Sequence, residues 1–409
     1  MSSESWFTAK RIRIHGLLLA FCLWTVYAVD MSAPGLLDRN GLVKGTDFLH
    51  FYTLGSLALR GRGDLLYNMR VQADLARKFV ARAPDSVYVP LYGPQVSLSF
   101  APFARLPYGR ALVAWLGVNI LIYAFCCYAV WKNCPSLQAY RWTVLILAIA
   151  FPGFFHLLAW GQNSALALLC FTLAFLALRR DHTVLAGLAV GSLIFKPQLG
   201  LAAAVVFVFA REWKVVAGAL MAATVQLAAA WMHYGSEVMH TYLRALRNVE
   251  GVLPLLEPRL YQTHSLRSFW SLLLPWPHVA FGLYVVTAIG ILVLAVRCRQ
   301  SNAPLSIRFS ALLFTTVLVS PHLTVYDLII LAPAFLLLSD WTVAHREQPF
   351  APRTRQLLYL CYPLFLIGPW ARITHLQLSV VAMTALLWIT WRISSRSPWP
   401  AAATLPVSF

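Results

Sequence analysis

The sequence is poor in charge, and acidic residues are its scarcest charged class. Only 12% of the 409 residues are charged, and 15 Asp and Glu stand against 33 Lys and Arg, which gives a formal net charge of +18. Water-soluble domains usually carry about 25% charged residues. The basic excess does not indicate nucleic-acid binding, because these residues flank apolar runs and form no single patch with interleaved aromatics. We therefore expect no nucleic-acid partner.

Cysteine patterns and nucleotide motifs are also missing. The seven cysteines lie almost entirely in apolar runs or beside basic clusters, and they form neither a disulfide framework nor a metal spacing. The sequence has no P-loop, no dinucleotide fingerprint and no HExxH motif. These absences argue against an ATP-driven pump. They also lead us to expect no cofactor and no metal.

The sequence is rich in apolar residues, which make up 59% of the chain with a mean hydropathy of +0.66. Many occur in runs of the length that spans the ~30 Å hydrocarbon core of a bilayer. We predict an all-α polytopic membrane protein with about 12 transmembrane segments. These segments lie near residues 14–30, 107–131, 141–158, 163–179, 184–196, 198–210, 213–233, 277–297, 306–320, 323–339, 356–371 and 374–392.

Basic residues predict the orientation. Lys10, Arg11 and Arg13 place the N-terminus in the cytoplasm, and later basic clusters fall in alternate links, so the C-terminus is predicted there too. Residues 184–210 leave two alternatives, because two short segments meet at Lys196 and Pro197, and one proline-kinked span would reverse every later link. We prefer two segments. The expected location is the plasma (inner) membrane, with several crossings.

Two stretches are too polar to span a bilayer. Residues 31–106 form a long first extracytoplasmic loop, and residues 234–276 form a second large loop, within a single membrane-embedded domain of residues 1–409. In the first loop, residues 47–59 have the apolar spacing of an amphipathic helix. We expect such helices to lie in the membrane interface.

Ionisable residues inside apolar segments are candidates for function, because their burial in a membrane is costly. Lys196 and His322 each stand beside a proline that interrupts an apolar pair of segments, and Asp327 follows His322 closely. A lysine and a histidine in one outer cavity could bind a phosphate. Two structural alternatives stay open, since Lys196 could extend to the interface and His322 could bond a helix end.

Asp47 begins the predicted loop helix. On the residues alone, the favoured interpretation is an N-cap whose carboxylate accepts backbone N–H groups. Its aromatic neighbours Phe48, Phe51 and Tyr52 also suit a general base, because they would remove water from a carboxylate beside a sugar.

Several short motifs in order resemble glycosyltransferase family 87, the mannosyltransferase-like membrane enzymes of the GT-C class. They cover most of the chain and comprise residues 45–48, 51–52, Gly61, 66–67, 88–94, Pro102, 106–108, Trp115, 161–163, 186–188 and 196–197. The chain departs from the family at residues 263–266, where Thr-His precedes Ser-Leu instead of the frequent Asn-Gln.

The resemblance implies an inverting hexosyltransferase, with mannose the expected sugar. The donor would be a polyprenyl-phosphate-sugar, and the acceptor a lipid- or glycan-linked sugar on the extracytoplasmic side, with membrane lipids as surroundings. The implied catalytic base is Asp47, and the implied substrate-binding residues are Lys196, His322, Gln162, Asn163, Tyr52, Tyr92, His264 and Arg267. The alternative is a transporter or flippase for a lipid-linked glycan, because broken helices beside charges also serve transporters. A non-enzymatic scaffold is a third alternative.

Overall fold

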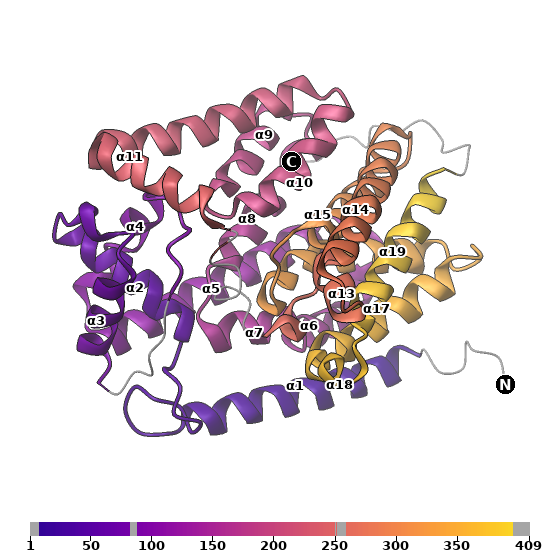
Figure 1. The fold of residues 1–409 in the computed structure, drawn as a ribbon. Coiled ribbons are helices and arrows are strands. Elements are labelled where there is room, and N and C mark those ends of the chain that lie inside the picture. The colour runs from indigo at the N-terminus through magenta and orange to yellow at the C-terminus, as the bar shows by residue number, and fades with distance from the viewer. Residues whose placement is uncertain (1–7, 82–87, 250, 252–258, 396–409) are drawn as a thin grey trace.

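The computed structural model of the protein describes residues 8–81, 88–249, 251 and 259–395, which form a bundle of helices (Figure 1). Within these ranges every secondary-structure element longer than an isolated bridge is a helix. The strand-like contacts are two isolated bridges, Leu37 with Val43 and Thr263 with Thr324. The predicted all-α fold class is therefore confirmed.

In the described part of the chain, five helical stretches are long and apolar enough to cross a membrane. In four of them only 11% to 28% of the apolar stretch is buried in the bundle, as expected of helices that face lipid, whereas 72% of the last is buried. They are α1 (Ala9–Met31), α5 (Tyr108–Trp131), α11 (Trp213–Arg247), α14 (Pro277–Gln300), and η7 (Val325–Leu331) continuing into α16 (Ala332–Ala344).

Two bent pairs of helices would raise that number to seven if each pair counts as one span. Prolines explain the bends, because they cannot donate the backbone bond that continues a helix. The first pair, bent by 40°, joins η4 (Pro135–Tyr140) and α6 (Arg141–Ile149) to α7 (Pro152–Trp160). The second, bent by 71°, joins α17 (Ala351–Leu366) to η8 (Gly368–Trp370) and α18 (Ala371–Thr374).

The other apolar helices are shorter than the bilayer core is thick. At 1.5 Å per residue, the longest reaches only ~26 Å against ~30 Å of hydrocarbon. They are α8 (Ser164–Arg179), α9 (Thr183–Gly191) with η5 (Ser192–Phe195), α10 (Pro197–Phe209), α15 (Leu305–Val319) and α19 (Leu378–Ser394). Every predicted segment therefore coincides with a helix, while about 12 full crossings stays a prediction.

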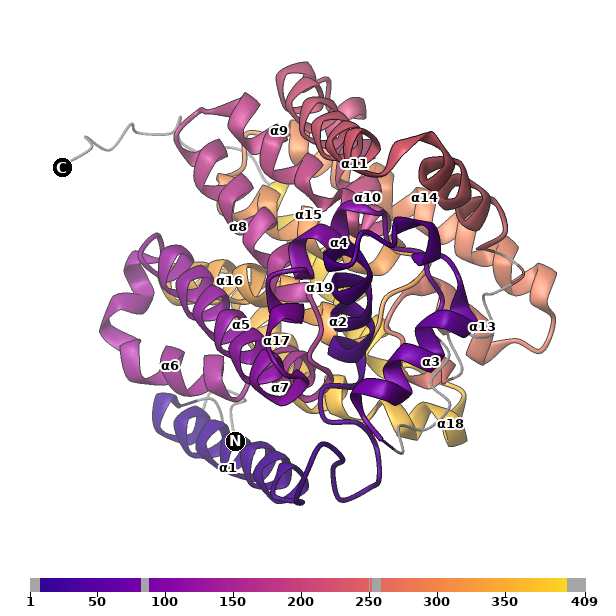
Figure 2. The same cartoon turned by 90° about the vertical axis from the view of Figure 1, so that its left-hand side faces the viewer.

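The first predicted loop folds into helices gathered at one end of the bundle (Figure 2). They are α2 (Thr46–Leu59), η2 (Gly63–Leu65), α3 (Met69–Phe79), α4 (Gln95–Phe100) and η3 (Phe103–Arg105). The helix predicted at 47–59 is confirmed, and the expected place of such loop helices in the membrane interface stays a prediction. Every residue from 48 to 58 is buried, because α3, α4, η3 and α5 pack around α2. Gly55 permits the contact with α4, since a Cβ there would lie 2.4 Å from the Phe100 carbonyl oxygen.

The second predicted loop starts where α11 changes direction. Gly235 has φ 80° and ψ 177°, a backbone conformation that glycine adopts without a Cβ clash, and the helix resumes beyond it to Arg247. The predicted boundary at 234 thus falls on a kink within a helix. Further on, η6 (Leu260–Gln262) and α13 (Leu266–Leu273) lead into α14, while residues 252–258 lie outside the described residues.

The centre of the bundle brings the turn after α7 close to η7. Helix α7 packs directly on η7. Gly153 makes this approach possible, because a Cβ at that position would lie 2.6 Å from the backbone nitrogen of Ile329. Because of this contact, the turn at residues 161–164, which follows α7, lies close to Asp327, which precedes Ile329. The polar site described next lies there.

Candidate functional site

The site is built around the turn between α7 and α8. Helix α7 ends at Gly161, which has φ 67° and ψ 33°, the left-handed conformation that glycine supplies at helix ends. Helix α5 holds this turn, because Trp115 Nε1 donates to the Gly161 carbonyl at 2.9 Å and Asn119 Nδ2 donates to the Gln162 carbonyl at 3.2 Å. A Cβ at 161 would lie 2.8 Å from the Cβ of Phe48, so the turn also fits closely against α2.

Asp47 lies in the first turn of α2 and points at this loop. The N-cap of α2 is Gly45, and no side chain caps the helix, so the N-cap interpretation of Asp47 is wrong. Its Oδ2 instead accepts a hydrogen bond from Gln162 Nε2 at 3.1 Å. That bond joins the first loop to the membrane bundle across 115 residues of sequence.

The protein surroundings of Asp47 stabilise its protonated form relative to its ionised form, compared with the same carboxyl group in water. The pKa of Asp47 is raised to about 7, mainly by loss of hydration and to a smaller extent by the nearby negative charge of Asp327. The Gln162 hydrogen bond and the positive charges of Lys196 and His322 act in the opposite direction and hold the pKa of Asp47 down. A carboxylate with these neighbours can gain or lose a proton near neutral pH.

An aromatic cluster fixes the position of α2 and of Asp47. The rings of Tyr52, Phe100, Phe103, Tyr108 and Trp115 surround Phe48 at 5.7 to 6.4 Å between centroids. The Tyr108 hydroxyl donates to the Lys44 and Gly45 carbonyls, and the Tyr88 hydroxyl donates to the Thr46 carbonyl. The backbone that precedes Asp47 is therefore held from two sides.

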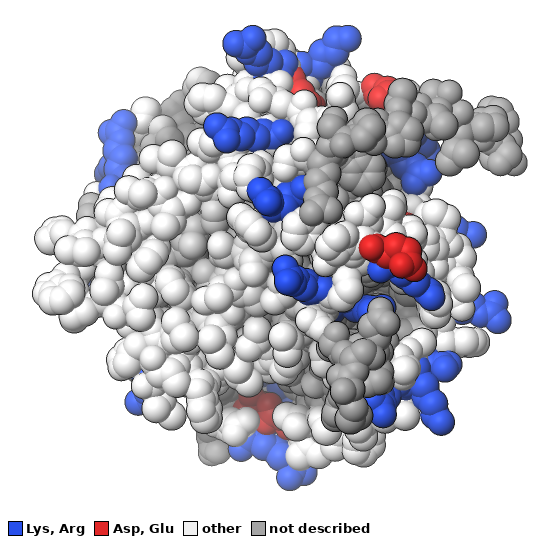
Figure 3. All heavy atoms as spheres, turned by 90° about the vertical axis from the view of Figure 1, so that its right-hand side faces the viewer, with Lys and Arg blue, Asp and Glu red and all other residues white. Residues whose placement is uncertain are grey.

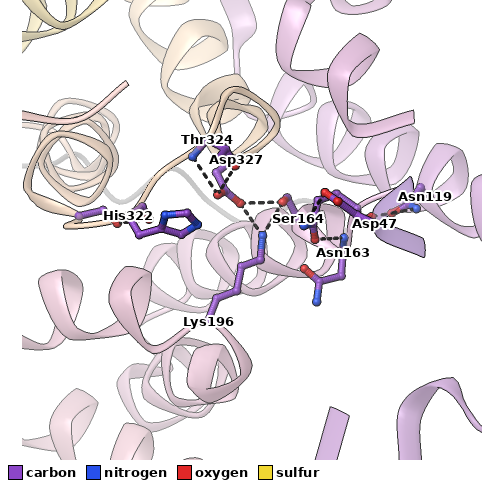
Figure 4. Close-up of polar contacts among 10 residues, drawn as sticks. Asp47, Asn119, Asn163, Ser164, Lys196, His322, Thr324 and Asp327 are labelled. Atoms are coloured by element: carbon purple, nitrogen blue, oxygen red, sulfur yellow. Dashed lines mark hydrogen bonds and ion pairs between the residues drawn. The ribbon is translucent and has the colours of Figure 1, made fainter. Parts of the chain in front are cut away.

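Lys196 lies at the break between η5 and α10, and it is buried in a charged network (Figure 4). Its Nζ donates to Ser164 Oγ at 2.7 Å and to Asp327 Oδ1 at 2.5 Å, and Ser164 Oγ also donates to Asp327 Oδ1 at 2.7 Å. The other oxygen of Asp327 accepts from the backbone nitrogen and hydroxyl of Thr324, at 3.4 and 3.3 Å. The lysine therefore does not extend to the interface, and that structural alternative is wrong.

Three consecutive residues connect the two acidic groups. Gln162 bonds Asp47, Ser164 bonds Lys196 and Asp327, and Asn163 lies between them (Figure 4). The Asn163 side chain is 1% exposed, and neither atom of its amide has a hydrogen-bond partner among the described residues. Figure 4 shows this amide directed into the space beside the Lys196 side chain. A buried amide without a partner is a group that a bound ligand can satisfy.

His322 approaches the same space from the break between α15 and η7. It is partly exposed, and its ring points toward Lys196 and Asp327 (Figure 4). Its backbone carbonyl accepts a hydrogen bond from Ser320 Oγ at 2.8 Å, which fixes the local chain. The structure thus brings Asp47, Lys196 and His322 together, although they are far apart in the sequence.

Tyr92 also belongs to this group. Burial raises the pKa of Tyr92, and the negative charges of Asp327 and Asp47 raise it further. Its hydroxyl is therefore a neutral donor close to both acidic side chains. Its carbonyl accepts from the Tyr67 hydroxyl at 3.1 Å, which fixes the turn that carries it.

Three predicted substrate contacts have other partners in the structure. The Tyr52 hydroxyl donates to the Leu106 carbonyl at 2.8 Å, and its ring packs edge-on against Phe79. His264 is 1% exposed and bonds Ser379 Oγ through Nδ1 at 2.7 Å. Arg267 Nη1 donates to the Pro321 carbonyl at 2.8 Å, so Arg267 lies next to the segment of His322. Tyr52 and His264 contribute to packing here, and Arg267 borders the site.

Asp327 and Ser164 are the site residues that sequence reasoning did not assign. Asp327 is an ionisable residue of an apolar segment, and the sequence contains a signal for its pairing. A lysine buried at membrane depth needs a counter-charge, and the chain offers few acidic residues in apolar segments. Ser164 gave no such signal, because a serine at the start of a helix is usual.

Among the described residues, no three His, Cys, Asp or Glu side chains lie together as a metal site would require. The expectation that no metal or cofactor is needed stays a prediction.

A comparison with protein families matches this architecture to one of them. The family model of glycosyltransferase family 87 matches residues 91–321, which is more than half of the chain. The matched range contains Tyr92, Gln162, Asn163 and Lys196, whereas Asp47 precedes it and His322 follows it directly. No curated protein and no solved structure matches the chain.

Proposed function

We propose that the chain, which belongs to glycosyltransferase family 87 and is a membrane glycosyltransferase, transfers a hexose, specifically mannose, from a polyprenyl-phosphate-sugar to an acceptor.

 The acceptor is a lipid- or glycan-linked sugar on the extracytoplasmic side of the inner membrane. The observation that carries the proposal is the placement of Asp47 beside Gln162 in the cluster that also holds Lys196 and His322.

Asp47 is proposed as the general base. Its carboxylate takes the proton of the acceptor hydroxyl while that oxygen forms a bond to the anomeric carbon of the donor. The bond from the anomeric carbon to the phosphate oxygen breaks, and its electron pair stays with the lipid phosphate. A single displacement of this kind inverts the anomeric centre. A pKa of about 7 for Asp47 supports this role, because a base works best when its pKa is near the operating pH.

Lys196 and His322 are proposed to bind the donor phosphate. Negative charge grows on the phosphate oxygen as the sugar leaves, and fixed positive groups in a water-poor pocket stabilise that charge. Asp327 and Ser164 hold the Lys196 ammonium at the pocket wall before the donor arrives. Asn163 and Tyr92 are proposed to bond the sugar or phosphate, since the Asn163 amide is buried without a partner.

The remaining predicted residues are proposed to act around this centre. Arg267 borders the segment of His322 and is placed to meet the outer part of a substrate. Tyr52 would act by holding α2 in place, because its hydroxyl donates to the Leu106 carbonyl. His264 would act by fixing the chain next to His322, because its backbone N–H donates to the Leu323 carbonyl.

Sidedness is also proposed, with both termini in the cytoplasm and the pocket on the opposite face. Tyr108, at the start of α5, contacts Gly45 near the pocket, and Lys132 follows the other end of this 24-residue helix, ~36 Å away. Figure 3 shows the face of the bundle that lies away from α2 and α3, where Lys and Arg are spread widely and Asp and Glu are few. Such a distribution supports a cytoplasmic face.

The test is sugar transfer by the purified chain in detergent, with polyprenyl-phosphate mannose as donor and a membrane lipid extract as acceptor. Asp47→Asn should lower turnover by about 10²–10⁴-fold, the usual contribution of a general base. Asp64→Asn is the matched control, because Asp64 is an exposed acid of the same loop and pairs with Arg62.

Turnover retained in Asp47→Asn would remove Asp47 from the catalytic role. Transfer in detergent also separates the enzyme from a flippase, since a flippase does no chemistry when the membrane barrier is absent. A wild-type chain that transfers no sugar from polyprenyl-phosphate hexoses would reject the proposed donor class.

A further inference from the structure

Two apolar grooves flank helix α6 at the end of the bundle away from Asp47. The first, the Arg346 groove, has a volume of about 360 Å³ and runs between α1, α6, α16 and α17, with Arg346 and Arg355 in its lining. The second, the Arg141 groove, has a volume of about 340 Å³ and lies between α5 and α6, with Arg141 in its lining. Tyr123, Cys127, Val144 and Ala148 line both grooves.

The grooves exist because α6 packs loosely. No residue of α6 is buried, although the helix lies between α1 and the core. Pro152 bends the chain away after residue 149, so α6 contacts its neighbours over only a short length. Protein interiors are normally filled to high density. The two open grooves on either side of α6 therefore leave room for apolar groups of a bound molecule.

The groove linings are apolar in their depth and basic at one end. Arg346 Nη2 donates to the Tyr140 hydroxyl at 2.8 Å, and Tyr140 directly precedes Arg141 at the start of α6. Arg346 and Arg141, one from each groove, therefore both lie at the same end of α6. The Nε of Arg355 is buried and has no hydrogen-bond partner among the described residues. A buried guanidinium nitrogen without a partner favours an anion as the missing group.

We propose that these grooves bind one anionic glycerophospholipid. Its phosphate lies among Arg346, Arg355 and Arg141, and its two acyl chains lie in the two grooves on either side of α6. Charge complementarity favours this occupant over a zwitterionic lipid, whose amine would meet the same arginines. Basic pockets between helices on the cytoplasmic side of a membrane commonly hold anionic lipid head groups. Neither groove is lined by Asp47 or by a residue proposed to bind the donor, so this site is separate from the proposed donor pocket.

The experiment measures lipid retention by the full chain. The purified protein is stripped of lipid in detergent and then incubated with phosphatidylglycerol or phosphatidylethanolamine that carry identical acyl chains. Native mass spectrometry counts the bound lipid. We expect about tenfold tighter retention of phosphatidylglycerol, because the ammonium of phosphatidylethanolamine would be repelled by the arginines and would compete with them for the phosphate.

Arg355→Gln should reduce phosphatidylglycerol retention about tenfold. Arg353→Gln is the matched control, because Arg353 is an exposed arginine of the same helix and does not line the groove. Ser339→Phe tests the acyl chains separately, since Ser339 lines the Arg346 groove alone. The wild-type chain should retain phosphatidylglycerol with two acyl chains better than the form with one acyl chain. The phenylalanine side chain should fill the Arg346 groove and remove that preference.

Three results would overturn the proposal. These are equal retention of the two lipids, equal losses in Arg355→Gln and Arg353→Gln, and displacement of phosphatidylglycerol by polyprenyl-phosphate mannose, which would assign the grooves to the donor tail. If Ser339→Phe does not fold, the arginine pair still decides the outcome. Because the readout is bound lipid, it is independent of sugar transfer.

Discussion

Lys196 and Asp327 form an ion pair that is sealed inside the protein, with 2.5 Å between Nζ and Oδ1 and side chains only 3% and 2% exposed. Removing two charges from water is costly, and only good geometry with further hydrogen bonds offsets that cost. Ser164 and Thr324 supply those bonds. The pair is thus complete without a ligand, and its role in stability must be separated from its role in binding.

A double substitution should make that separation. Lys196→Met alone leaves Asp327 as a buried unpaired charge, which should lower the free energy of unfolding by about 3–5 kcal/mol. Lys196→Met with Asp327→Leu removes both charges and should recover most of that loss. We nevertheless expect the double variant to transfer no sugar, because the phosphate has lost its lysine. Thermal unfolding and transfer assays in the same detergent measure the two effects.

A double variant that folds well and keeps wild-type turnover would show that Lys196 serves only to pair with Asp327. Glu212 and Arg299 provide the control, since they form another ion pair that contains none of the residues proposed to bind substrate. Replacing both of these residues with apolar ones should leave the KM for the donor unchanged.

The pH dependence of transfer should report Asp47. The pKa of Asp47 is about 7, so about a tenth of the carboxylate is ionised at pH 6 and about nine tenths at pH 8. A general base acts only when ionised, and kcat/KM should therefore rise about tenfold per pH unit below 7 and level off above it. Assays in detergent across pH 5 to 9 would show this rise. A profile that stays flat down to pH 5 contradicts the prediction.

The hydrogen bond from Gln162 should set the position of that rise. It stabilises the ionised form and lowers the pKa of Asp47. Gln162→Leu removes it, so the acidic limb of the pH profile should move to higher pH by about one unit, which corresponds to one bond to a charged group. Gln138→Leu is a suitable control, because Gln138 donates to Trp131 and Cys134 carbonyls away from Asp47. A limb that moves to lower pH, or does not move, would contradict this reading of the bond.

A glycine comparison should show how closely the turn must fit. Gly161 and Gly41 both have positive φ, 67° and 76°, so alanine strains the backbone at either position. At 161 the new Cβ would also lie 2.8 Å from the Cβ of Phe48, whereas at 41 nothing lies within 4 Å. We expect Gly161→Ala to lower kcat about 10²-fold through misplacement of Gln162. Gly41→Ala should cost only about 1 kcal/mol of stability and leave kcat unchanged.

The sequence was sufficient for the helical fold and for much of the site. Long apolar runs leave the backbone no alternative to helices in a membrane, so each predicted segment found a helix. Lys196 and His322 were recognisable because charge at membrane depth is rare, and both lie at helix breaks beside prolines. These features depend on single residues and their near neighbours, which a sequence displays directly.

Features that depend on packing between distant segments could not be predicted. The apolar spacing of α2 indicated one buried face, yet α3, α4, η3 and α5 enclose it completely. The preference for an N-cap at Asp47 failed because Gly45 begins the helix in a left-handed conformation. Tyr52 carried a family motif, but its hydroxyl bonds the Leu106 carbonyl, a partner 54 residues away.

The turn after α7 has a consequence for how such an enzyme can diversify. Gln162 bonds the Asp47 carboxylate and Ser164 bonds the Lys196 ammonium. The separation between these two contacts is therefore limited by the two peptide units that join residues 162 and 164, at most ~7.6 Å of chain. This separation is fixed by covalent bonds, so it does not change when the sequences of the outer segments change. New acceptors would then be accommodated by remodelling the peripheral helices, while the span between hydroxyl and phosphate stays constant.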